Sequence, residues 1–343
     1  MQQQQQPVRK SIDRSSIAHF ISMIHRAKLG PPPLSEVEAV PPPIVTIGKK
    51  RTRPEDEYVV SELDSYKITD KETWRKWRDE QIVPSASMIA SYFGLGYKSI
   101  TQELREIAKL DAAPEPNAIV SRMMNHGDEF EDAAKRAYVE QSASKKIQYI
   151  TNGENSYIFE IERNDKRCKV LVTPDMVVNI DKDPLLDEDA TDKRVVEIKC
   201  PAYGTTFKSR PIPEVVEDHI RKWPFGKPGH FLQAATYAFV FECNRFDVFY
   251  YFTNTINTAW VRIRYKMTEQ LKDMLFGALV FCNERLDIIV NRQTCPYPIP
   301  RATERKKNAI KVMEECFLFT TQLVECEPDL EEEATDHSEN NGP

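Results

Sequence analysis

Two short segments in the middle of the chain combine acidic and basic residues in a pattern that could do chemistry. Asp175 follows a proline at the start of one strand-like run, and Glu197 and Lys199 stand two residues apart in a later run. Because side chains alternate across a strand, Glu197 and Lys199 project from the same face. If the two strands pair, Asp175 joins them there. Two carboxylates beside an ammonium are the groups that metal-assisted hydrolysis of a phosphodiester requires.

Each of these groups has a physical role in that chemistry. Neighbouring carboxylates repel one another, and a bound Mg²⁺ or Mn²⁺ relieves the repulsion while leaving positions open for water and phosphate. Lys199 would orient the attacking water or support the charge of the transition state. Cys200 comes next in the sequence, but its side chain alternates away from Lys199 and no His-Asp partner is near in sequence. We therefore predict a packing role for this cysteine, not a nucleophilic one.

The two segments together resemble a known nuclease motif. Pro174–Asp175 and Glu197–Pro201 are similar to the PD-(D/E)XK motif, and the Cys-Pro continuation resembles the branch that contains phage lambda exonuclease, YqaJ-type viral recombinases and viral alkaline exonucleases. The resemblance implies that Asp175, Glu197 and the main-chain carbonyl of Ile198 hold one or two Mg²⁺ ions, which Mn²⁺ can replace. It also implies that Lys199 positions the nucleophile.

A helix-like segment supplies a third carboxylate. Residues 125–131 resemble the G-x-x-x-E helix of the same branch, and the spacing from Gly127 selects Glu131 over Glu129. The resemblance implies that Glu131 is catalytic and contributes to the metal site directly or through water. The alternative interpretation is an ordinary helix in which Glu131 pairs with Lys135, four residues further on.

The resemblance also implies residues that bind DNA phosphates. Residues 74–87 resemble the W-x-x-x-R and (I/V)-T-A-S elements of this branch, although the interval between them is about two residues longer here. Residues 233–237 resemble its Q-x-x-x-Y helix, which follows the catalytic strands. Phosphate contacts of this kind give affinity without sequence preference. The implied residues are Arg78 and Ser87, with Ser85 as the alternative to Ser87, and Gln233 and Tyr237.

The ordered motifs cover roughly residues 71 to 265, which is more than half of the chain. They imply a Mg²⁺-dependent deoxyribonuclease that digests double-stranded DNA ends from the 5′ side, in recombination, repair or genome processing. They also imply a single-strand annealing or single-strand-binding protein as partner, and a toroidal homo-oligomer. Three alternatives stay open: a structure-specific endonuclease with the same site, an inactive nuclease-like scaffold that binds DNA, and RNA as the substrate. The iron–sulfur nucleases of the superfamily do not fit, because the cysteines form no cluster.

The elements that must position these residues suggest an α/β fold. We predict a restriction-endonuclease-like core, with a central mixed β-sheet flanked by helices and helical additions at both ends. The expected helices are 70–80, 85–93, 99–109, 118–142, 213–222, 230–242, 268–290 and 303–323. The expected strands are 157–162, 168–172, 175–180, 194–199, 246–253 and 259–265. A long acidic connection, 181–193, is expected to be a solvated hairpin, with a secondary cation site as the alternative.

The composition divides the chain into three regions. Residues 1–65 are expected to be a flexible extension with an amphipathic helix at 15–29 and a proline-rich linker. Residues 66–325 form the nuclease-like domain, and 326–343 an acidic, disordered tail. Seven acidic residues of that tail account for the formal net charge of −6, so the rest of the chain is close to neutral. A positive surface for nucleic acid must therefore be local.

The sequence also bears on the compartment. The 343 residues contain no apolar run long enough to span a bilayer, and the N-terminus lacks the apolar stretch of a secretory signal. Seven scattered cysteines indicate reduced thiols and suggest neither a disulfide framework nor a zinc site. We therefore expect an intracellular protein outside the membrane. The basic cluster from Lys49 to Arg53 is typical of a nuclear-import signal or a phosphate-contacting arm; a charged linker in a cytoplasmic protein is the alternative.

Overall fold

The computed structural model describes residues 57–112, 114–141, 147–180, 192–201, 227–253, 258–292 and 302–325, all within one compact unit, Lys50–Pro343. Five predicted features lie wholly or mostly outside these ranges: the helix at 15–29, the basic cluster at 49–53, the acidic connection, the helix at 213–222 and the acidic tail. Among the described residues, no helix has the length and apolar character needed to cross a membrane.

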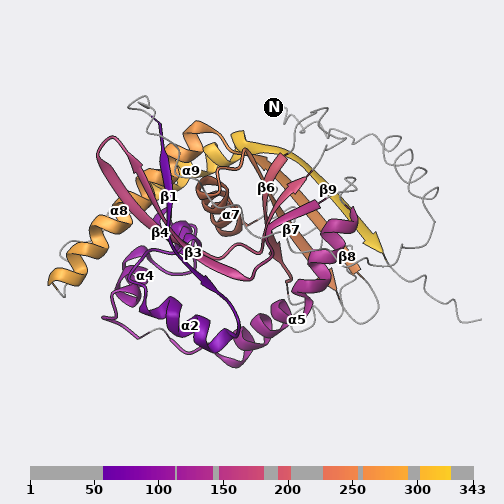
Figure 1. Cartoon of the computed structure of the whole chain (residues 1–343), viewed down its shortest axis with the longest axis horizontal. Coiled ribbons are helices and arrows are strands. Elements are labelled where there is room, and N and C mark those ends of the chain that lie inside the picture. Colours follow the sequence, from indigo (N-terminus) through magenta and orange to yellow (C-terminus); the bar gives the residue numbers. More distant parts are fainter. Residues whose placement is uncertain are drawn as a thin grey trace, which may run out of the picture. The chain divides into compact units, whose positions relative to one another are not determined.

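Two sheets form the centre of the described structure (Figure 1). The smaller is antiparallel, in the order β1-β3-β4, with β1 Val59–Lys67, β3 Asn155–Arg163 and β4 Lys166–Val172. The larger has the order β2-β5-β6-β7-β8-β9. Its strands are β2 Ile147–Thr151, β5 Met176–Ile180, β6 Asp192–Lys199, β7 Arg245–Thr253, β8 Thr258–Lys266 and β9 Phe317–Glu325. The β6–β7 pair is parallel and the other pairs are antiparallel, so this sheet is mixed.

Helices cover both faces of the larger sheet, which confirms the predicted α/β class. The α7 helix (Pro228–Val240) lies between the two sheets and is buried on nearly all sides, as its almost wholly apolar sequence requires (Figure 1). The α5 helix (Ala118–Gln141) packs Ala134 and Tyr138 on the opposite face of the larger sheet. The remaining helical segments are α2 Lys71–Glu80, η2 Ala86–Met88, α3 Ile89–Tyr92, α4 Ile100–Ile107, α8 Glu269–Arg292 and α9 Thr303–Cys316.

Local sequence explains where several helices begin. The Asp70 carboxylate accepts the backbone N–H groups of Glu72 and Thr73, which caps α2. The Ser99 hydroxyl accepts the N–H of Gln102 and caps α4 in the same way. Both helices therefore start within a residue or two of the predicted positions.

Three strands differ from the prediction. The expected helix at 303–323 ends at Cys316, and the chain continues as β9, whose Phe, Thr and Val residues favour a strand and pair with β8. The β1 strand was not predicted because it is largely solvent-exposed and its sequence carries little hydrophobic alternation. It pairs with β3 from Val59 onward, so the packed body begins before the predicted boundary at residue 66. The short β2 strand was also missed.

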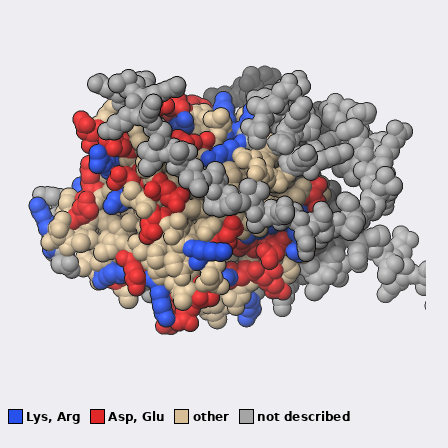
Figure 2. Space-filling model, viewed as in Figure 1, with Lys and Arg blue, Asp and Glu red and all other residues tan. Residues whose placement is uncertain are grey.

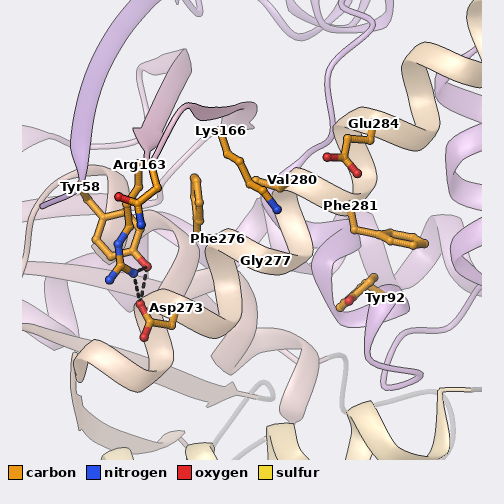
Figure 3. A pocket seen from close by; sticks show the side chains of 11 residues that line it. Tyr58, Tyr92, Arg163, Lys166, Asp273, Phe276, Gly277, Val280, Phe281 and Glu284 are labelled. Atoms are coloured by element: carbon orange, nitrogen blue, oxygen red, sulfur yellow. Dashed lines mark hydrogen bonds and ion pairs between the residues drawn. The ribbon is translucent and has the colours of Figure 1, made fainter. Parts of the chain in front are cut away.

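The start of β1 is tied to α8 by a polar cluster (Figure 3). The Arg163 guanidinium lies 4.5 Å from the centroid of the Tyr58 ring, and both side chains contact the Asp273 carboxylate. These residues line a cavity of about 480 Å³ together with Phe276 and Lys166. None of the predicted site residues lines this cavity. Over the described part of the face in Figure 2, acidic and basic side chains are interspersed.

Candidate active site

The pairing of β5 with β6 brings the first two predicted residues together. Met176 is the register partner of Val196, so Asp175, one residue before β5, lies opposite Glu197. The Asp175 Oδ2 atom accepts the backbone N–H of Ile198 at 2.7 Å, which fixes this carboxylate against β6. The Ile198 side chain packs into the apolar cluster under α5. Glu197 and Lys199 consequently face α7, as strand alternation predicts.

Lys199 and Glu197 form an ion pair on this face. Glu197 is fully buried, whereas the Lys199 side chain is 26% exposed, so Lys199 is the member of the pair that solvent can reach. On the neighbouring strand, Tyr250 is the register partner of Lys199. The Tyr250 hydroxyl accepts the backbone N–H of Lys227 at 2.9 Å, and its oxygen lies 3.1 Å from His230 Nδ1.

Glu131 reaches the same region from α5. Its Oε1 atom lies 2.7 Å from the Nζ atom of Lys135, one turn further along the helix. Glu131 is half-buried, and its negative charge raises the pKa of both Asp175 and Glu197. Glu129, the alternative to Glu131, is exposed. The structure therefore brings Glu131, Asp175, Glu197 and Lys199 into one electrostatic group.

Burial and mutual repulsion set the pKa values of this group. Burial, followed by the charge of Asp175, raises the pKa of Glu197 to about 8, against the opposing effect of Lys199. The pKa of Asp175 is also raised, by burial and then by Glu131, while Lys199 and the Ile198 N–H oppose the rise. Burial lowers the pKa of Lys199, but the two carboxylates outweigh it and the net shift is upward. Ionising both acids is thus costly unless more positive charge is present.

The residues present fit a divalent cation. The Glu197 Oε2 atom is buried and has no hydrogen-bond partner among the described residues, although a buried carboxylate oxygen normally has one. Asp175 and Glu197 are hard oxygen donors of the kind that Mg²⁺ and Mn²⁺ prefer. In the described part of the chain, no three His, Cys, Asp or Glu side chains are already gathered as a metal-binding group. Glu131 and Glu197 are instead each held by a lysine.

The predicted phosphate-binding residues of α7 lie beside this group. Gln233 Nε2 donates to the Tyr237 hydroxyl at 2.9 Å. Tyr237 is only 4% exposed. Its pKa is raised well above the usual value by burial and then by Glu197 and Asp175. Tyr237 therefore faces the acidic pair from inside the protein, and Gln233 is the more accessible of the two.

The predicted phosphate-binding residues before α3 lie in two places. Arg78 is on α2, and Ser85 and Ser87 lie between α2 and α3. The Ser85 and Ser87 hydroxyl oxygens are 3.1 Å apart, so the two candidate serines form one polar pair. A bridge between Ser85 and Leu171 places them at β4. No hydrogen bond or ion pair among the described residues links Arg78 or either serine directly to the acidic pair.

A relay of hydrogen bonds nevertheless connects α2 to the strand that leads to Asp175. The Arg78 guanidinium lies 4.9 Å from the centroid of the Trp74 ring. Trp74 Nε1 donates to Ser156 Oγ at 2.7 Å, and Ser156 Oγ lies 2.6 Å from Thr173 Oγ1, two residues before Asp175. The spacing of the W-x-x-x-R segment thus has a physical reason: the tryptophan anchors the helix and supports the arginine one turn later.

Sequence reasoning missed three residues of this region. Lys135 was seen only as a helix ion-pair partner, because its burial depends on the β2–β3 turn. Tyr250 was predicted only as part of the strand at 246–253, because the strand order that places it beside Lys199 is non-local. Gly153 carries no signal in the sequence beyond a turn-forming Asn-Gly pair.

Comparisons with known proteins bear on these residues. Residues 73–234, just under half of the chain, match the YqaJ-like viral recombinase domain. No curated protein sequence matches the chain. Among solved structures, the chain is similar to the crystal structure of an alkaline exonuclease, LHK-Exo, from Laribacter hongkongensis, with 16% identity and a TM-score of 0.42 over 71% of this chain and 100% of that one. For LHK-Exo in complex with dAMP, the identity is 14%, with the same TM-score and coverage.

The limits of the domain match, residues 73 and 234, enclose Arg78, Glu131, the Asp175–Glu197 pair, Lys199 and Gln233. Residues 73–234 therefore match the YqaJ-like viral recombinase domain, which confirms the resemblance predicted from the motifs over this part of the chain.

Proposed function

We propose that this protein is a divalent-metal-dependent DNA nuclease that digests double-stranded DNA from a free 5′ end. One observation carries the proposal: the buried carboxylate of Glu197 and the half-buried carboxylate of Asp175 meet at paired strands beside Lys199, within a YqaJ-like viral recombinase domain. A purely structural role does not explain this burial, because replacing a buried ion pair by apolar residues is often neutral or stabilising.

The residues would divide the work by their positions. Asp175, Glu197 and the Ile198 carbonyl would hold Mg²⁺ or Mn²⁺, with Glu131 contributing directly or through water. When bound, such an ion supplies positive charge to the phosphate and lowers the pKa of a coordinated water. The ammonium of the partly exposed Lys199 side chain would orient the attacking water and support the charge that develops on phosphorus oxygens. Arg78, Ser87 with Ser85, and Gln233 would contact phosphates.

The decisive experiment removes the ammonium. Lys199→Ala should abolish Mg²⁺-dependent cleavage of linear duplex DNA while leaving the fold and the affinity for DNA largely unchanged. Activity is measured by release of acid-soluble nucleotides, folding by circular dichroism, and binding by fluorescence anisotropy. A Lys199→Ala protein that cleaves like the wild type refutes the assignment.

A second experiment tests for the metal. A ligand that binds only the folded state raises Tm, so Mg²⁺ should raise the Tm of the wild type in a concentration-dependent way. Asp175→Asn removes one charge from the ion's ligands and should remove most of this rise. Equal rises in both proteins would contradict the metal site and favour a nuclease-like scaffold that does not turn over.

The dependence on a free end separates an exonuclease from an endonuclease. Linear duplex DNA should be degraded, and covalently closed circular DNA of the same sequence should survive. Cleavage of the closed circle would favour the structure-specific endonuclease with the same site.

A duplex protected at its 5′ ends tests the polarity, and a matched RNA duplex tests the preference for DNA. The toroidal oligomer, the annealing partner and the nuclear location stay predictions.

A further inference from the structure

Lys135 is a buried lysine in the middle of α5. The residue is 8% exposed, next to Ala134 and near Tyr138, both fully buried. A buried ammonium needs partners that replace its hydration. In the described part of the chain, Lys135 Nζ has two such partners: Glu131 Oε1 at 2.7 Å and the backbone oxygen of Asn152 at 3.0 Å. The ammonium is therefore held from one side by its own helix and from the other by the turn between β2 and β3.

That turn approaches the ammonium as closely as a glycine permits. Gly153 has a φ of +86°, which other residues rarely adopt. A Cβ atom at this position would lie 2.8 Å from Lys135 Nζ, 3.3 Å from the Asp175 backbone oxygen and 3.6 Å from Glu131 Oε1. The ammonium, the third carboxylate and the residue that leads into β5 thus surround one point of the turn. The positive charge of Lys135 also opposes the rise in the pKa of Asp175.

An ordinary helix ion pair would look different. Glu72 and Lys76 on α2 have the same four-residue spacing and an N–O distance of 2.8 Å, but their side chains are 79% and 69% exposed. Such surface pairs contribute little to stability. Lys135 differs in being buried, in holding a backbone carbonyl as well, and in lying beside Asp175.

We infer that Lys135 is the positioning residue for Glu131: its ammonium, fixed on the Asn152 carbonyl, holds the Glu131 carboxylate beside Asp175. Without Lys135, repulsion from Asp175 would drive Glu131 outward, because the Glu131 side chain is already 37% exposed. Lys135 acts through Glu131 and does not touch the substrate. The inference rests on the proposed function, since it assigns the third carboxylate of that site its support.

The test uses the full chain without DNA and measures the apparent affinity for Mg²⁺ from the rise in Tm. Lys135→Met keeps the length of the side chain and removes the charge. We expect it to weaken Mg²⁺ binding by ~10-fold, the lower end of the loss usual when a residue that orients a metal ligand is removed. Lys76→Met removes the exposed pair of equal spacing and should bind Mg²⁺ like the wild type.

A double-mutant cycle separates positioning from a general effect of charge or stability. Glu131→Ala should weaken Mg²⁺ binding, and Lys135→Met should cause no further loss in that background. An undiminished loss in the Glu131→Ala background overturns the inference, as does wild-type affinity in Lys135→Met. Tighter binding in Lys135→Met would also overturn it, by showing that the lysine competes with the cation. If the wild type itself shows no Mg²⁺-dependent rise in Tm, the proposed function fails instead.

Discussion

The carboxylate pair at the end of β6 is unusual because it holds more negative charge than the groups around it offset. Lys199 contacts Glu197, the N–H of Ile198 contacts Asp175, and Glu197 Oε2 has no hydrogen-bond partner in the described part of the chain. A side chain kept in this state costs folding free energy. The cost is understandable if a cation binds there, since its charge would favour ionisation of both acids.

The raised pKa of Glu197 predicts how the thermal stability of the protein depends on pH when a chelator is present. The folded state binds this proton more tightly than the unfolded state, with a pKa of about 8 against an ordinary 4.5. The contribution of this raised pKa to the free energy of unfolding is fully present below pH 4.5 and is lost as the pH rises to about 8. The shift of Asp175 has the same sign. In EDTA, Tm should therefore fall across this range.

Glu197→Gln is the control for that prediction. The amide cannot ionise, so the decline of Tm with pH should be much shallower in this variant. Thermal melts followed by intrinsic fluorescence in a pH series give both curves. Superimposable curves for the variant and the wild type would show that Glu197 does not titrate in this range.

The α2 helix illustrates how an element outside the acidic pair is fixed to the strands that lead to it. Its start is capped by Asp70, and Lys71 forms an ion pair with Asp128 of α5 at 2.6 Å. Trp74 is bonded to Ser156, which in turn lies against Thr173 on the approach to Asp175. The helix is thereby fixed relative to the strands, and so is Arg78, which rests on the Trp74 ring.

Trp74→Phe should weaken DNA binding without changing Mg²⁺ binding. The substitution keeps an aromatic ring but removes the hydrogen bond to Ser156, which is worth about 1 kcal/mol, or a factor of about 5 in affinity if it is transmitted to Arg78. Ser156→Ala removes the same bond from the other side and should give a similar loss. Trp77→Phe is the matched control, because Trp77 lies on the same helix as Trp74 but stacks on Tyr66 of β1. Wild-type DNA affinity in Trp74→Phe would exclude the relay from substrate binding.

Across the whole described unit, one buried charge cluster joins elements that are distant in sequence. Asp247 on β7 accepts two hydrogen bonds from Arg264 on β8, both at 2.9 Å, and one from the Tyr138 hydroxyl of α5 at 2.8 Å. Arg194 on β6 lies 3.5 Å away. These side chains are almost fully buried, on the face of the sheet opposite α7. The cluster thus ties α5, which carries Glu131, to three central strands.

Asp247→Asn should be strongly destabilising. It leaves Arg264 without its bidentate carboxylate, and breaking a buried ion pair on one side costs about 3–5 kcal/mol. The expected result is a large fall in the urea midpoint with little change in the m-value. Asp111→Asn, which breaks a partly exposed bidentate pair with Arg105, should leave the midpoint almost unchanged. A small effect of Asp247→Asn would mean that the cluster does not hold α5 in place.

Much of the candidate site was accessible from the sequence because it depends on local rules. Strand alternation put Glu197 and Lys199 on one face, and the pairing of the two flanking strands brought Asp175 to them, as the register now shows. The family resemblance selected Glu131, and helix periodicity located α5 to within a residue. Central strands and helices were likewise predictable, because buried elements have a strong hydrophobic periodicity in their sequence.

The remainder depends on contacts between residues far apart in the chain. Exposed β1 was missed because its sequence carries little hydrophobic pattern, and edge strand β9 was taken for the end of a helix because it follows α9 without an intervening loop. Nothing local shows that Lys135 is buried, that Gly153 passes within contact distance of its ammonium, or that Trp74 reaches Thr173 through Ser156. The residue types and their order thus follow from the sequence, whereas burial, charge balance and the supports of the acidic group arise when distant segments pack together and exclude water.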